Sequence, residues 1–83
     1  MNLKLEKLYK INDNTKLKGV ASVIIDDCFK VTDIKIIEGE NGLFLAMPTK
    51  QLKNGDRIDL VHPINQETRE LFNKVIFDAY NEE

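Results

Sequence analysis

The sequence predicts an α+β fold, in which a small twisted antiparallel sheet of four to five strands is followed by a C-terminal α-helix. Three observations favour this class. Segments rich in branched apolar residues alternate with turn residues as far as residue 61. Residues 66–81 then carry apolar side chains at helical spacing. The 83 residues fit one domain, 1–83, at the small end of what folds without disulfides or metals.

Three strands are expected in the first half of the chain, at residues 2–11, 17–26 and 29–37. The apolar face of the first strand shifts between Leu5 and Leu8, which suggests a β-bulge. Residues 12–15 tolerate turn conformations and form a loop. Asp26 and Asp27 fit a tight hairpin turn, so the second and third strands are expected to pair.

The fourth strand, at residues 43–48, is unusual because Leu43 to Met47 are apolar without alternation. Successive side chains of a strand point to opposite faces, so this run buries both faces. A chain of this length has room for one core. The second face therefore needs cover from the helix or from a second copy of the chain.

A short hairpin is expected at residues 49–61, since Asn54–Gly55 suits a type I′ turn. Pro63 ends this segment, and Asn65 is placed to cap a helix at residues 66–81. The apolar stripe of that helix consists of Leu71, Phe72, Val75, Ile76, Ala79 and Tyr80.

Phe77 projects off this stripe, between Asn73 and Asn81, where solvent is expected. A lone exposed aromatic residue is common in soluble proteins. The other interpretation is a contact with a protein partner, and the pattern favours neither.

The composition indicates an ordered domain of a reducing compartment. No segment approaches the about 20 apolar residues of a membrane span, and the N-terminus lacks the apolar core of a signal peptide. The single Cys28 excludes an internal disulfide. We therefore expect a cytoplasmic protein without membrane insertion, in which Cys28 is a packed or semi-exposed thiol.

The net charge of −2 does not indicate nucleic-acid binding, but its distribution is uneven. Residues 63–83 hold five acidic against two basic side chains, whereas residues 48–62 hold three basic against two acidic ones. The three basic residues are Lys50, Lys53 and Arg57, on a hairpin able to reach a phosphate backbone. An ordinary solvated loop explains the same pattern and is favoured by spacing alone.

Little in the chain indicates catalysis. His62 precedes Pro63 in a turn, and a lone histidine there is usually structural. No second His or Cys lies at metal-ligand spacing. Asp26–Asp27 suits a turn, without the burial that acid–base work requires. We expect a non-enzyme with no catalytic residues, no metal and no cofactor.

Two stretches carry a resemblance to a known family. They are Asp33-Ile34-Lys35-Ile36-Ile37 and Gly39-x-x-Gly42-Leu43-Phe44-Leu45-Ala46-Met47-Pro48, followed by Gly55, Asp59, His62-Pro63-Ile64 and Arg69. The chain resembles the SpoVG family (stage V sporulation protein G) of bacteria over nearly its whole length. After Lys50 the family usually has a second basic residue, where this chain has Gln51.

The resemblance implies a homodimer that pairs strands across its interface, a role in septation and sporulation, and binding of DNA or RNA as a regulator. The dimer interface then falls on the apolar run, at Leu43, Phe44, Leu45 and Met47. The nucleic-acid contacts fall on Lys50, Lys53, Arg57 and Arg69, although Arg69 is also placed for an ion pair with Glu67 or Glu70.

The alternative function is a protein-interaction module of the division or sporulation machinery. In that case Phe77 and the acidic helix face contact a partner protein, without direct binding of nucleic acid.

Overall fold

The computed structural model describes residues 1–12 and 14–82; Asp13, within the expected loop 12–15, and Glu83 lie outside the described residues. The expected α+β class is confirmed. In chain order the elements are β1 (Leu3–Lys10), β2 (Leu17–Ile25), β3 (Phe29–Gly39), β4 (Gly42–Ala46), β5 (Thr49–Gln51), β6 (Arg57–Asp59) and α1 (Gln66–Glu82).

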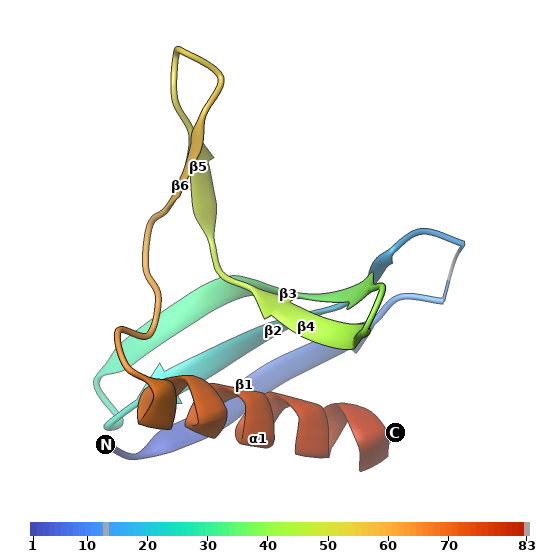
Figure 1. The fold of residues 1–83 in the computed structure, drawn as a ribbon. Coiled ribbons are helices and arrows are strands. Elements are labelled where there is room, and N and C mark those ends of the chain that lie inside the picture. Colours follow the sequence, from blue (N-terminus) through green and yellow to red (C-terminus); the bar gives the residue numbers. More distant parts are fainter. Residues whose placement is uncertain (13, 83) are drawn as a thin grey trace.

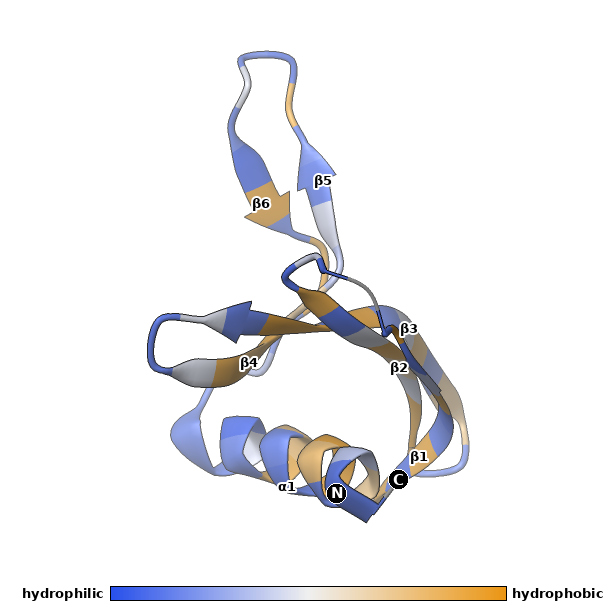
Figure 2. Ribbon diagram, turned by 90° about the vertical axis from the view of Figure 1, so that its right-hand side faces the viewer, coloured by the Kyte–Doolittle hydropathy of each residue, from blue (hydrophilic) through white to orange (hydrophobic). Residues whose placement is uncertain are grey.

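The first four strands form one antiparallel sheet in the order β1-β2-β3-β4, and β5 pairs with β6 in a separate sheet. The four-stranded sheet curves, and α1 lies along its concave face, against β1 (Figures 1 and 2). β1 and β4 are the edge strands. The β5–β6 hairpin stands away from both the sheet and the helix (Figure 1).

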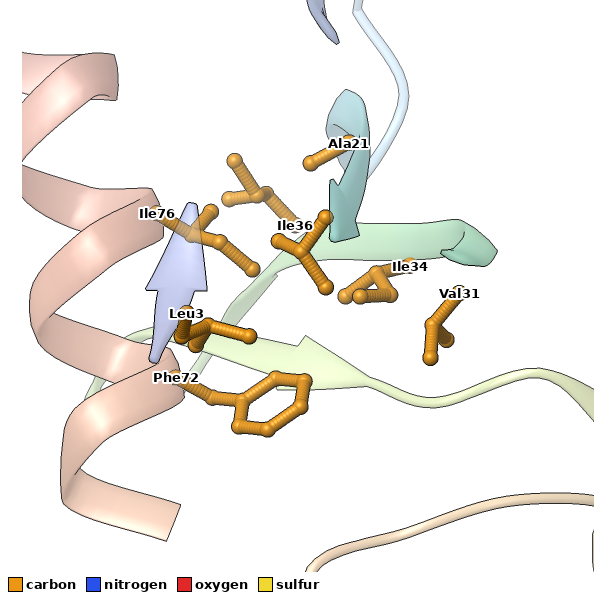
Figure 3. Packing of buried hydrophobic residues seen from close by; sticks show 8 residues of the cluster. Leu3, Ala21, Val31, Ile34, Ile36, Phe72 and Ile76 are labelled. Carbon is orange, nitrogen blue, oxygen red and sulfur yellow. The ribbon is translucent and has the colours of Figure 1, made fainter. Parts of the chain in front are cut away.

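The core lies between the sheet and the helix, where branched side chains of β2 and β3 meet two residues of α1 (Figure 3). Ile34, Ile36 and Ile76 are fully buried, and the ring of Phe72 closes the cluster beside Leu3. Burying one such side chain contributes about 1.5–3 kcal/mol relative to leaving it in water. The apolar spacing of the helix therefore predicted its packing face correctly at Phe72 and Ile76.

The apolar run divides its side chains between the two faces of β4. Leu45 pairs with the buried Ile36 and, like Met47, packs against the core. Phe44 points to the opposite face, where it is 49 % exposed. A Cβ atom placed on Gly39 would lie 3.0 Å from Phe44 Cε1, so the glycine makes room for this ring.

The sheet contains the expected bulge and two further register shifts that the sequence did not indicate. The β1–β2 register shifts between Leu5 and Lys7, as predicted. The β2–β3 register shifts between Leu17 and Gly19 and again between Ala21 and Val23. The latter shift coincides with Asp33 of β3, whose φ is 61°. Left-handed backbone at a bulge increases the local twist of a strand.

The two hairpin turns differ in their backbone conformation. Asp26 and Asp27 have φ of 51° and 57°, and the Cys28 amide donates to the Ile25 carbonyl at 3.0 Å, as in the expected tight turn. The expected type I′ turn at Asn54–Gly55 is wrong. Only Gly55 has a positive φ there, 95°. The loop has three residues, because the Leu52 amide bonds the Asp56 carbonyl at 2.7 Å, an arrangement typical of a glycine bulge.

The helix begins as the sequence indicates. The Asn65 side-chain oxygen accepts a hydrogen bond from the Thr68 amide at 2.8 Å, which satisfies one of the free N–H groups of the first turn. The expected exposure of Phe77 is wrong, since this side chain is half-buried and packs against the core. The curved sheet wraps around α1, so its apolar contacts extend beyond the stripe that the spacing defines.

Candidate nucleic-acid interface

The candidate site is built on the hairpin that we call the arm, residues 48–60. Its strands extend from the apolar run, because Pro48 and Leu60 continue the ladder with a bond from the Leu60 amide to the Pro48 carbonyl at 2.8 Å. The arm projects well beyond the four-stranded sheet (Figures 1 and 2). Such a two-stranded ribbon has the dimensions to enter a major groove of duplex DNA.

The strand register divides the arm into two faces. Lys50 pairs with Ile58, whereas Gln51 pairs with Arg57. Directly opposed residues share a face, and neighbours along a strand point to opposite faces. Lys50 and Arg57, which the sequence grouped as one basic set, therefore lie on opposite faces of the arm.

Lys53 occupies the loop at the end of the arm. The loop is ordered by the Asn54 side chain, whose oxygen accepts from the Asp56 amide at 3.0 Å and whose nitrogen donates to the Asp56 carboxylate at 3.3 Å. Gly55 supplies the positive φ that closes the loop. The loop thus presents Lys53, which is exposed, to solvent at the end of the arm.

The cations of the arm have no internal partner within the described part of the chain. Lys50, Lys53 and Arg57 are all exposed, and none makes an ion pair or a hydrogen bond there. By contrast, Lys4 is 3.0 Å from Asp27, and Lys30 is 2.7 Å from Glu6. The arm cations are therefore free to contact an external anion.

Arg69 is separate from this set. It lies in the first turn of α1, and its guanidinium is 3.5 Å from the Pro63 carbonyl oxygen. Over the described ranges, 1–12 and 14–82, no ion pair joins it to Glu67 or Glu70. The structure does not bring Arg69 together with the arm cations.

The segment that joins the arm to α1 closes over the core. The His62 ring is 3.0 Å from the Pro63 carbonyl oxygen through Nδ1, and Pro63 is buried. A small, mostly apolar pocket lies beneath it, lined in part by Val31, Met47 and Phe72. His62 thus has a local hydrogen bond within its turn.

The structure contains one polar cluster that the sequence did not indicate. Glu6, in the β1 bulge, accepts a hydrogen bond from the Ser22 hydroxyl at 2.8 Å. Its carboxylate also forms an ion pair with the Lys30 ammonium, with 2.7 Å between Oε2 and Nζ. The Lys30 ammonium first, and the Ser22 hydroxyl second, hold the pKa of the Glu6 carboxyl below its ordinary value of 4.5. Because these residues come from three strands, only the register could have indicated their meeting.

Residues 1–12 and 14–82 contain no group of three or more His, Cys, Asp or Glu side chains arranged to hold a metal ion. They also contain no helix with the length and hydropathy needed to cross a membrane.

Comparison with known proteins gives a consistent result. The SpoVG family model matches residues 1–82. A protein of Phytoplasma australiense named "Putative septation protein SpoVG" is 47% identical over 76 residues, which cover 92% of this chain and 79% of the relative. A protein of the same name from Caldicellulosiruptor bescii is 47% identical over 89% of this chain and 84% of its own length. A third, from Clostridium perfringens, is 46% identical over 96% of this chain and 89% of the relative. The chain therefore belongs to the SpoVG family.

Proposed function

We propose that this protein is a homodimeric regulator of septation and sporulation that binds DNA or RNA through the arm. The relatives' names supply the connection with septation. The observation that carries the binding proposal is the projecting arm, whose three exposed cations have no partner within the described residues. Phosphate oxygens satisfy such cations, and phosphate contacts supply most of the affinity of non-specific binding.

The proposed dimer uses β4, an edge strand of the four-stranded sheet. An unpaired strand edge is a ready template for another strand. Leu43 and Phe44 are 37 % and 49 % exposed there. Leu45 and Met47 pack against the protomer's own core, so Leu43 and Phe44 carry the side-chain part of the proposed interface.

Pairing of two β4 edges about a twofold axis would double the arm. In an antiparallel pair of identical strands this axis is perpendicular to the sheet, so both arms would emerge on the same side. Two arms on one side would give one nucleic acid two sets of contacts, which raises the effective affinity.

Binding is tested with a gel-shift titration on DNA and RNA. The double variant Lys53→Glu/Arg57→Glu is compared with Lys7→Glu/Lys16→Glu, which makes the same change of charge at exposed positions away from the arm. We expect the arm variant to lose at least about tenfold in affinity because it replaces attraction to phosphate by repulsion. The control should lose much less. Equal losses in both variants would refute the assignment to the arm.

A further inference from the structure

The two faces of the arm differ in chemistry. One face carries Gln51 and Arg57, flanked by Thr49 and Asp59, and is polar. The other carries Ile58 and, two residues on, Leu60, beside Lys50. Ile58 is 47 % exposed and Leu60 is 61 % exposed. Figure 2 shows the corresponding hydrophobic band within β6, in an arm that is otherwise mostly hydrophilic.

This apolar face is only partly covered by the arm's own protomer, since Leu60 lines an open pocket with Phe29 and Val31 of β3, whereas Ile58 does not. Within the described residues, β5 and β6 pack extensively only on each other. An isolated two-stranded hairpin is marginally stable in water, so a hairpin of this kind normally rests on another surface. Phosphate groups are contacted by basic and polar side chains. Nucleic-acid backbone is therefore a poor partner for the apolar face of the arm.

The size of the proposed dimer interface indicates what covers this face. β4 has 5 residues, whereas stable specific interfaces use about 20–30 residues from each partner. Pairing of the two β4 strands therefore needs additional contact area. The arm follows β4 directly in the chain, with Met47 alone between Ala46 and the start of the arm at Pro48, so it lies beside that interface.

We propose that the apolar face of the arm, Ile58 and Leu60 with Lys50, packs on a second copy of this chain. The polar face, with Gln51 and Arg57, then remains open to nucleic acid. This inference rests on the dimer of the proposed function, and it assigns Lys50 to the dimer. In that packing the Lys50 methylenes would lie along the apolar surface while the ammonium stays in water, as long basic side chains commonly do.

The test compares the same new residue on the two faces. Ile58→Thr removes apolar surface while keeping a β-branched side chain suited to a strand, and Leu60→Thr extends the change. Gln51→Thr is the control on the opposite face. Sedimentation velocity without nucleic acid measures the dimer dissociation constant. We expect Ile58→Thr/Leu60→Thr to raise it at least about tenfold, and Gln51→Thr to leave it within about twofold.

A second measurement needs no variant and so does not depend on variant folding. Hydrogen exchange of the arm amides in the unmodified protein is followed as a function of protein concentration. Protection that rises together with the dimer fraction supports the proposal, because packing on a second copy suppresses opening of the hairpin. Protection that appears only when nucleic acid is added assigns the apolar face to nucleic acid and overturns the proposal.

Phe44→Ser separates the inference from the dimer on which it rests. If Phe44→Ser dissociates the protein but Ile58→Thr/Leu60→Thr does not, the dimer stands and the role of the arm in it is wrong. If the unmodified protein is monomeric at every concentration, both are overturned. Gel-shift results do not enter this comparison, so a failure of nucleic-acid binding would be seen separately.

Discussion

Individual side chains in this protein have roles that depend on contacts across strands. Glu6 shows this most clearly, because the bulge in β1 brings its carboxylate to Ser22 of β2 and Lys30 of β3. Gly39 is a second case, since its missing side chain leaves room for the ring of Phe44. Asn65 acts locally, through its bond to the Thr68 amide.

Glu6→Gln tests the charged cluster through the pH dependence of stability. The folded pKa of Glu6 lies below its ordinary value of 4.5, so the carboxylate stabilises the fold above that pH. The contribution is lost as pH falls through the lowered pKa. Urea unfolding at several pH values should show the variant less stable than the parent at pH 7, with the difference shrinking in acid. A difference independent of pH would contradict this role.

Asn65→Ala removes the helix cap. We expect a loss of about 1 kcal/mol in the free energy of unfolding, because the Thr68 amide loses its partner. Asn65→Asp is the control, since aspartate is an equally good cap and its charge favours the N-terminus of a helix. Urea midpoints followed by circular dichroism measure both. Equal losses in the two variants would show that the bond does not stabilise the helix.

At the scale of elements, α1 illustrates how far the sequence goes. Periodicity locates the helix, and the predicted apolar stripe includes both of its buried residues, Phe72 and Ile76. It misplaces Phe77, because a helical stripe describes one flat contact whereas this sheet curves around the helix. Sheet curvature depends on bulges such as the one at Asp33, and the sequence did not indicate that bulge.

Phe77→Ser is expected to destabilise the protein by about 1–3 kcal/mol, since it removes half-buried apolar contacts. Chemical denaturation measures the change. Asp78→Ser, at a neighbouring exposed position of the same helix, is the control and should cost much less. If Phe77→Ser is as stable as this control, the Phe77 side chain makes no significant contact with the core. A contact of Phe77 with a protein partner would then again be a reasonable interpretation.

For the arm as well, the sequence predicts local features but not those that depend on the strand register. Its position and its basic residues could be predicted, because Gly55 and the polar stretch around it indicate a hairpin. Which residues share a face could not, because a loop of three residues and a loop of two place Lys50 opposite different partners. The candidate site was thus predictable as a segment but not as a surface.

At the scale of the whole molecule, one compact sheet-and-helix unit supports an arm that does not contribute to its core (Figure 1). β4 connects the two parts. Its inner side chains complete the core, its outer edge is the proposed dimer contact, and its C-terminal end leads into the arm. The acidic residues of α1 lie away from the arm, so the net charge of −2 does not preclude local binding of an anion.

The central claim, that the arm contacts phosphate, is tested most directly by the salt dependence of binding. Fluorescence anisotropy on one labelled duplex gives the slope of log K against log salt concentration for the parent, Lys53→Glu/Arg57→Glu and the control Lys7→Glu/Lys16→Glu. The slope should fall by about 1 for each phosphate contact removed, in the arm variant only. A slope unchanged by the arm substitutions would contradict the account.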